Sequence, residues 1–156
     1  MPTFNAQLWT RTIREHRNPL LAAGEDCKRI VLQGRPLVDY AVDIAAKLGC
    51  PVAATGNLLP AVKERNAGLK AKKMWLAEIF RYLEDDWAEP LLADRPDLLI
   101  LIGYRPAMVQ GLAAGARGVH LVHLGPGRLP AAHLSVEETT LQEWKRQLDD
   151  LLKALE

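Results

Sequence analysis

The sequence predicts a three-layer α/β/α sandwich built around a mostly parallel sheet. Apolar strand-like runs alternate with segments of helical periodicity, and this alternation is typical of parallel α/β folds. The run at 97–103 has a continuously apolar centre, as expected for a parallel strand that is buried on both faces. Several runs end at a glycine. The 156 residues, 49% hydrophobic and 25% charged, are sufficient for one domain over residues 1–156.

The predicted elements follow one another in the order α-β-(β)-α-β-α-β-α-β-α. Strands are expected at residues 19–23, 29–33, 51–56, 97–103 and 119–124. Helices are expected at residues 5–16, 36–48, 69–87 and 106–112, and after residue 135 to the C-terminus. Residues 57–69 predict a loop with about one helical turn, because Pro60 and Gly68 interrupt any longer pattern. Crossovers between parallel strands of this kind are almost always right-handed.

Capping residues and proline mark the boundaries of the first two helices. Asn5 is a suitable N-cap for the first helix. Pro36 suits the first turn of the second helix, and Gly49 suits the position that follows its last turn. Between them, apolar residues recur at helical spacing and form one stripe, which predicts a helix with a buried face.

The later helices are predicted from their apolar stripes and from two start signals. The helix over 69–87 has a strong stripe that includes Trp87. Pro106 is expected to start the next helix. Ser135 stands three residues before a glutamate, which is the spacing of a capping box, and the final helix that it starts has Trp144 on its apolar face.

Charge, cysteine content and hydropathy exclude several classes of function. Lys plus Arg is 20 and Asp plus Glu is 19, so the net charge is +1 and no extended nucleic-acid surface is expected. Cys27 and Cys50 cannot supply the four thiolates of an iron–sulfur cluster, and two isolated cysteines indicate a reducing compartment. No basic segment followed by an apolar run opens the chain, and no run approaches the ~18–20 residues of a membrane span. A cytoplasmic location without membrane association is therefore expected.

The candidate binding site lies at the carboxyl ends of the predicted parallel strands, where open α/β sheets bind their ligands. A bound nucleotide or flavin is expected to lie across Gly24, Thr55, Gly56, Gly103, Tyr104, Arg105 and Gly125. Glycine at a strand end permits a close backbone approach, although glycines also simply end strands in any α/β fold. Arg105 precedes a helix N-terminus, where binding of an anion is favoured, so it can hold a phosphate or a carboxylate of a partner. The alternative is a solvated surface arginine. A bulky residue at Gly103 is expected to block the ligand and leave the fold intact.

Specific phosphate-binding motifs are absent from the sequence. It contains neither G-x-x-x-x-G-K-[ST] nor G-x-G-x-x-G. Residues 125–127 form a G-x-G that Pro130 soon follows, so they predict a turn rather than a diphosphate cradle. Residues 55–57 stand where a dehydrogenase of the Rossmann type would hold a ribose with an acid. An ordinary NAD dehydrogenase is therefore not expected.

Metal-ligating and nucleophilic side chains are scattered, so no metal site and no catalytic residue is predicted. His120 and His123 are three apart on a strand and point to opposite faces, so two separate, hydrogen-bonded histidines are expected. His133 lies on a loop and can join either one. Residues 85–86 diverge on a helix, which favours a solvated helix end over a metal site. Cys27 is expected to be exposed on a loop.

Trp75 is a candidate interface residue. It lies beside the apolar stripe of its helix and next to Lys72 and Lys73, which favours partial exposure, although a core tryptophan is the more frequent case. Exposed aromatic and arginine side chains are typical anchors of protein interfaces. Trp75 and the turn at 104–105 are therefore the candidate anchors for a partner.

In order and spacing, the chain resembles the epsilon subunit of the carbon monoxide dehydrogenase/acetyl-CoA decarbonylase–synthase complex. The stretches that carry this resemblance are 18–21, 34–41 and 51–56 and, most characteristically, 78–87 and 96–104. The resemblance implies a Rossmann-like nucleotide-binding domain of the DHS-like NAD/FAD-binding type, as in the middle domain of thiamine-diphosphate enzymes.

The resemblance also implies a role. It implies an accessory, non-catalytic subunit that stabilises the large nickel–iron–sulfur subunit of a CO dehydrogenase and assists electron transfer to a flavin, with FAD as the cofactor. The acid that the family carries after its last strand is missing at 123–128, which favours partner binding over flavin binding. A stand-alone nucleotide- or flavin-binding module that serves another oxidoreductase is the alternative, and a small α/β enzyme is a weaker one. A homo-oligomer is compatible with either.

Overall fold

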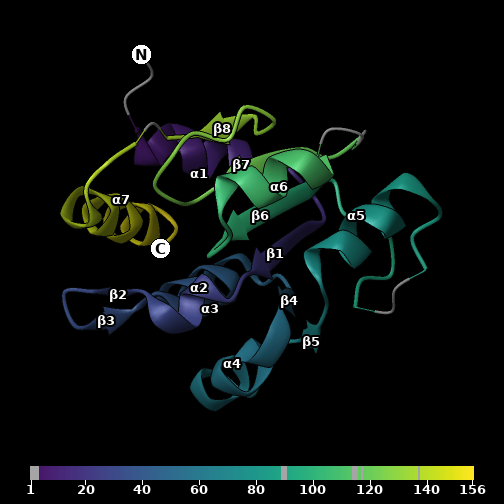
Figure 1. The fold of residues 1–156 in the computed structure, drawn as a ribbon, viewed down its shortest axis with the longest axis horizontal. Coiled ribbons are helices and arrows are strands. Elements are labelled where there is room, and N and C mark those ends of the chain that lie inside the picture. The colour runs from purple at the N-terminus through teal and green to yellow at the C-terminus, as the bar shows by residue number, and fades with distance from the viewer. Residues whose placement is uncertain (1–3, 89–90, 114–115, 117, 137) are drawn as a thin grey trace.

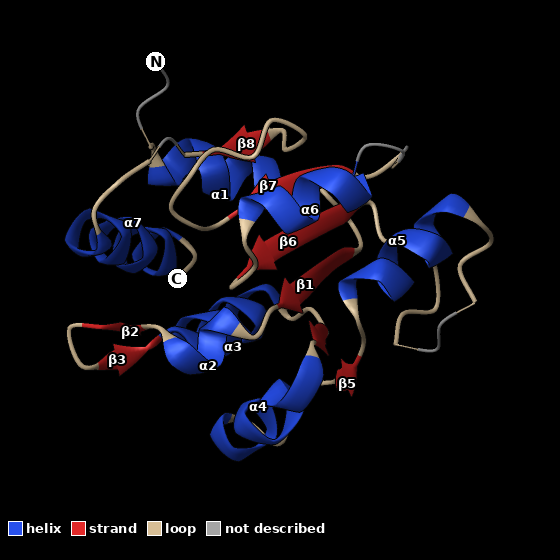
Figure 2. Ribbon diagram, viewed as in Figure 1, coloured by secondary structure: helices blue, strands red, loops and turns tan. Residues whose placement is uncertain are grey.

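The centre of the molecule is a six-stranded sheet in which every neighbouring pair of strands is parallel (Figures 1 and 2). The structure is a computed structural model, and it describes residues 4–88, 91–113, 116, 118–136 and 138–156. The sheet strands are β1 (Pro19–Ala23), β4 (Val52–Ala54), β5 (Ala71–Lys73), β6 (Leu98–Ile102), β7 (His120–His123) and β8 (Leu134–Ser135). Their order across the sheet is β5-β4-β1-β6-β7-β8, which is the 3-2-1-4-5-6 order of Rossmann folds.

Helices cover both faces of the sheet, so the predicted three-layer sandwich is confirmed. The helices are α1 (Ala6–Arg14), α2 (Asp26–Arg29), α3 (Leu37–Leu48), α4 (Leu59–Arg65), α5 (Leu76–Glu84), α6 (Pro106–Ala113) and α7 (Leu141–Ala154), with a 3₁₀ turn η1 at Gly56–Leu58. Helices α1, α3, α4 and α7 pack on one face, and α5 and α6 pack on the other (Figure 2). Among the described residues, no helix has the length and apolar character that a membrane crossing requires.

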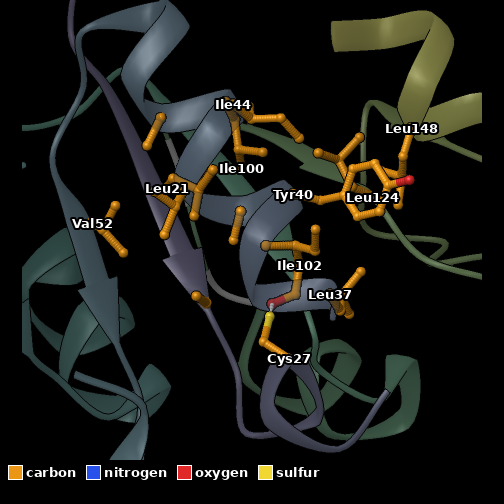
Figure 3. Close-up of a cluster of buried hydrophobic side chains, with 14 of the residues drawn as sticks. Leu21, Cys27, Leu37, Tyr40, Ile44, Val52, Ile100, Ile102, Leu124 and Leu148 are labelled. Carbon is orange, nitrogen blue, oxygen red and sulfur yellow. Dashed lines mark hydrogen bonds between the residues drawn. The ribbon is translucent and has the colours of Figure 1, made fainter. Parts of the chain in front are cut away.

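Strand β6 separates two hydrophobic clusters and contributes to both. All five of its residues are buried, because side chains alternate between the two faces of a strand and both faces are covered. Ile100 packs in the cluster under α3 and α7, whereas Leu99 and Leu101 pack under α5 and α6. Figure 3 shows the first cluster, to which α3 contributes Leu37, Tyr40 and Ile44. Each fully buried leucine or isoleucine stabilises the fold by roughly 1.5–3 kcal/mol.

The capping signals for α1 and α3 are confirmed. The Asn5 side chain accepts a hydrogen bond from the Leu8 amide at 3.0 Å and so caps α1. Pro36 precedes α3 in an extended conformation, and Gly49 ends the helix with a φ of 65°. That left-handed conformation is one that glycine adopts without steric cost, which is why the helix stops there.

The prediction that residues 29–33 form a strand of the main sheet is wrong. Residues Val31–Leu32 (β2) instead pair antiparallel with Arg35–Pro36 (β3) in a separate hairpin (Figure 2). Gln33 and Gly34 both have positive φ, the geometry of the two-residue hairpin turns that match strand twist. The short helix α2 before the hairpin has only one turn, too short to produce a periodic signal in the sequence.

The expected helix over 69–87 is too long at both ends. Its first part is the edge strand β5, which pairs with β4, and only Leu76–Glu84 is helical. Edge strands pair on one side and tolerate lysines, so β5 lacks the apolar pattern of a buried strand. Residues 57–69 hold more helix than the expected single turn, because η1 runs directly into the seven residues of α4.

Two expectations for the C-terminal half also change. Ser135 is not the N-cap of the last helix, because it lies in β8 and its hydroxyl accepts a hydrogen bond from the Leu129 amide at 2.9 Å. Thr140 caps α7 instead. Trp87 lies beyond the end of α5 and is only partly buried, with its Nε1 donating to the Leu92 carbonyl at 3.3 Å. Trp144 is buried in the core as expected.

Replacement of Gly103 by alanine is expected to destabilise the fold, and this corrects the expectation that a bulky residue there blocks a ligand harmlessly. Gly103 has a φ of 83°, and a Cβ on it would lie 2.5 Å from the Sγ of Cys27. Strain plus overpacking lowers the free energy of unfolding by roughly 2–4 kcal/mol, measured by urea denaturation. Gly111, in α6 with open space around its Cα, is the matched control, and Gly111→Ala should raise stability by about 0.5–1 kcal/mol. Equal effects at both positions would contradict this account.

Candidate functional site

A cleft of about 470 Å³ opens at the carboxyl ends of β1, β4 and β6. The chain leaves β1 toward the edge strand β5 and then returns to β6 on the other side of β1, so the strand order reverses between these two strands. Helix α2 leaves β1 on the α3 face of the sheet and α6 leaves β6 on the opposite face. Crevices at such a reversal are the usual ligand sites of open α/β sheets.

The floor of the cleft is a neutral pair of buried hydroxyls. The Thr55 Oγ1 and the Tyr104 hydroxyl are 2.8 Å apart, and Thr55 also donates to the Met74 carbonyl at 3.2 Å. Both residues are buried. Burial raises the pKa of Tyr104 far above its ordinary value, with only partial compensation from the Thr55 hydrogen bond. The tyrosine is therefore an uncharged part of the cleft floor at neutral pH and cannot act there as a base.

Two exposed apolar side chains face the cleft from different helices. Trp75 at the start of α5 is 51% exposed, and Met108 of α6 is 49% exposed. They are two of the five large hydrophobic side chains that are exposed in the described part of the chain. Leu76 and Leu112 extend the same apolar lining. Apolar exposure gathered in a concave surface indicates a ligand or partner contact rather than ordinary scatter.

The backbone holds Trp75 in place independently of its indole. Its amide donates to the Oε1 of Glu78 at 2.9 Å, which fixes the first turn of α5. The Nζ of Lys73 lies 5.8 Å from the centroid of the indole ring. The ring is thus presented at the cleft by a rigid helix start, and of the two alternatives for Trp75 the structure shows the partly exposed side chain and not the core one.

Four charged side chains surround the mouth of the cleft. Asp26 and Arg29, three residues apart around α2, form an ion pair with each other. Glu25 and Arg105 are exposed, and within the described residues neither has a side-chain hydrogen bond or an ion pair. The Glu25 carboxylate lies over Gly56, whose absent Cβ would collide with it. The mouth therefore offers one free carboxylate and one free guanidinium.

The structure brings most of the predicted site residues together. Four of the seven line the cleft directly: Thr55, Gly103, Tyr104 and Arg105. Gly24 and Gly56 lie next to it, Gly24 against the Gly103 carbonyl and Gly56 beneath Glu25.

Gly125 does not line this cleft. It follows β7, one strand beyond the reversal, and lies against a separate narrow crevice near Trp144. A Cβ there would come within 3.1 Å of the His123 ring, so the glycine makes room for that imidazole.

Sequence reasoning missed the acids and half of the apolar lining. Glu25 and Asp26 follow directly after the glycine that ends β1, a signal that was present in the sequence. Met108 and Leu112 are four residues apart on α6 and therefore share a face of that helix. Which neighbour that face meets depends on how α6 packs beside α5, and sequence periodicity alone does not determine this.

Cys27 is buried, which corrects the expectation of an exposed loop cysteine. It lies on α2 with no exposed surface, and its Sγ donates to the Ile102 carbonyl at 3.5 Å (Figure 3). Burial raises the pKa of the Cys27 thiol far above its ordinary value and that of Cys50 to about 12. Both cysteines are therefore protonated packing residues at neutral pH.

The histidines separate as expected, but with different partners. His123 is buried and its Nδ1 has no hydrogen-bond partner in the described structure, whereas His120 is exposed. The Nδ1 of His120 lies 2.9 Å from the Nε2 of His16, and its ring centroid is 4.3 Å from that of His133. Over the described residues, no three His, Cys, Asp or Glu side chains are arranged to hold a metal ion.

Comparison with known proteins identifies no relative. No model of a protein family matches the chain, and no curated protein is similar to it.

Acidification is expected to destabilise the protein because of two histidines. Burial lowers the pKa of His123, and burial together with His120 and His16 lowers the pKa of His133. The stability that these groups contribute is complete above the unfolded pKa of about 6.5 and is lost as the pH falls toward the lower folded values. Each histidine that is protonated in the unfolded chain but not in the folded one lowers the free energy of unfolding by at most ~1.4 kcal/mol for each pH unit.

Urea denaturation between pH 7.5 and pH 5 measures this loss. His123→Gln should have a flatter dependence of unfolding free energy on pH, even though the variant loses packing. An identical slope in the native chain and in His123→Gln would show that the His123 pKa is not shifted.

Proposed function

We propose that this chain is a non-catalytic binding domain that holds the planar ring of a nucleotide or flavin in the cleft. The observation that carries the proposal is the pair of exposed apolar side chains, Trp75 and Met108, at the point where the strand order reverses. Stacking of a base on an aromatic side chain contributes about 1–3 kcal/mol without requiring a specific hydrogen-bond pattern. The neutral floor of Thr55 and Tyr104 supports this, since a ring can lie on it without leaving a charge unsolvated.

FAD is the cofactor that the family resemblance implies, and the cleft supports binding of its flavin ring. A bound flavin supplies one- and two-electron transfer, which this chain's own side chains cannot provide. The contribution of the protein would be to stack the ring on Trp75, exclude water with Met108, and meet an anionic group with Arg105. We assign no proton transfer to the chain; the raised pKa of Tyr104 leaves no ionised form at neutral pH that could accept a proton.

Removal of the Trp75 indole is expected to weaken ring binding. Riboflavin and FAD are the probes, and their fluorescence, which stacking on an indole quenches, is followed during titration with the protein. Trp75→Ala should weaken binding about tenfold, the loss of about 1.4 kcal/mol of stacking. Leu141→Ala is the control, since Leu141 is 56% exposed but is not part of the cleft lining.

Both variants should be as stable as the native chain, because neither the Trp75 nor the Leu141 side chain is buried. If riboflavin, FAD and AMP all fail to bind the native chain at millimolar concentration, the binding function is refuted. Equal affinity of Trp75→Ala and native protein would place the ring elsewhere.

We propose further that the domain acts as an accessory subunit of a CO dehydrogenase-type complex and contacts its large nickel–iron–sulfur subunit. The resemblance of the stretches at 78–87 and 96–104 supports this role. The exposed Trp75 and Arg105 support it as well, because aromatic and arginine side chains are enriched among interface anchors. The second stretch includes β6 and the cleft residues Gly103 and Tyr104. The first includes most of α5, the helix whose first residues line the cleft.

Arg105→Ala is expected to weaken capture of the nickel–iron–sulfur subunit from an extract of the native host. Loss of an anchor costs ~2 kcal/mol or more, which is roughly thirtyfold in affinity. Arg11→Ala is the matched control, because Arg11 is exposed on α1, away from the cleft. Failure of the native chain to capture that subunit would favour a stand-alone binding module that serves another oxidoreductase.

A further inference from the structure

The turn that follows β1 differs from the turn that binds diphosphates in dinucleotide-binding folds. In those folds, free backbone amides of a glycine-rich turn and of the next helix point at the diphosphate. Here the Asp26 amide donates to the Gly103 carbonyl at 3.1 Å, and the Cys27 amide donates to the Gly24 carbonyl at 3.0 Å. The Lys28 amide donates to the Glu25 carbonyl at 2.9 Å. These three amides are already used, so they cannot hold a phosphate.

The charges around the same turn also oppose a diphosphate. Asp26 and Arg29 neutralise each other as an ion pair. Glu25, the first residue of the turn after Gly24, presents an unpaired carboxylate at the mouth of the cleft. Of the described cations that line the cleft, Arg105 is the one without an ion pair, and a diphosphate with two negative charges would meet its guanidinium and the Glu25 carboxylate.

The same carboxylate suits a different part of a nucleoside-like ligand. Ionised carboxylates accept hydrogen bonds and donate none, so Glu25 is a suitable partner for the hydroxyls of a ribose or ribityl chain. Its position over Gly56 places it at the ends of both β1 and β4, beside the floor residue Thr55. A ring in the cleft with its hydroxyls toward Glu25 leaves Arg105 for a single anionic group.

We propose that the cleft selects a hydroxylated planar ligand of the nucleoside or riboflavin type with at most one anionic group, and that Glu25 excludes ligands that carry a diphosphate. This inference rests on the proposed ring-binding function and narrows its ligand class. It also separates the two halves of FAD, because the cleft fits the flavin ring and its hydroxyls and does not fit the diphosphate. Glu25 acts here as a specificity-determining residue through its side chain, whereas its backbone carbonyl accepts from the Lys28 amide in α2.

The test compares riboflavin with FAD, which share a ring and differ by the adenosine diphosphate half. The native chain should bind riboflavin at least tenfold more tightly than FAD in fluorescence titrations at low ionic strength. Glu25→Gln should weaken riboflavin binding and strengthen FAD binding by about fivefold, the effect of one charge at about 4 Å in water. Glu64→Gln, at an exposed acid of α4 outside the cleft lining, should change neither affinity.

Opposite shifts for the two probes distinguish a specificity role from a structural one, since a damaged cleft would weaken both. The inference is overturned if the native chain binds FAD as tightly as riboflavin, or if Glu25→Gln leaves their affinity ratio unchanged. In both of those cases ring binding itself still stands. If neither probe binds the native chain, the proposed specificity fails, and the ring-binding function fails with it when AMP does not bind either.

Discussion

The architecture depends on one close backbone contact between the turns that follow β1 and β6. The Gly24 amide donates to the Ile102 carbonyl at 2.8 Å, and the Asp26 amide donates to the Gly103 carbonyl at 3.1 Å. Neither glycine can carry a side chain, because a Cβ on Gly24 would collide with the Gly103 carbonyl and one on Gly103 would lie 3.0 Å from the Gly24 carbonyl. The two central strands pair to their last residues, and the helices that follow them lie on opposite faces of the sheet. The cleft is the space left by that divergence.

That contact also determines the chemistry of the cleft. Three amides of the turn after β1, those of Asp26, Cys27 and Lys28, are used within the structure, and the charges at the mouth come from side chains. The charged side chains there are the ion pair of Asp26 and Arg29, the unpaired acid Glu25 and the unpaired Arg105. A site so built discriminates by the sign and number of charges on its ligand. It does not resemble a general anion cradle, in which many amides share one charge.

Features that depend on burial on two faces could be predicted from the sequence, and features at an edge could not. The strand at 97–103 and the helix at 36–48 were predictable from their patterns. A continuous apolar run is typical of a buried parallel strand, and a capped apolar stripe is typical of a helix with one buried face. The edge strand β5 was not, since pairing on one side imposes no apolar pattern and its lysines suit a helix equally well.

The same limit applies to the site. The rule that ligands bind at strand ends found Thr55 and the turn at 103–105, which the structure places at the cleft. It gave no reason to separate Gly125, because the sequence does not reveal how far β7 lies from the strand reversal. The face of α6 that carries Met108 became part of the lining only through its packing beside α5, a tertiary fact with no local signal.

The exposure of Trp75 and Met108 is not required by folding, and this is the strongest reason to connect the cleft with function. At each position the next residue makes the core contact: Leu76 is 3% exposed and Val109 is fully buried. The start of α5 needs only the backbone of Trp75, whose amide donates to Glu78, so any residue with an N–H would serve there. A polar side chain at either position would cost the fold little and would remove an apolar surface from water. Two large apolar side chains at the mouth of one cleft are therefore best explained by the ring or the protein surface that covers them.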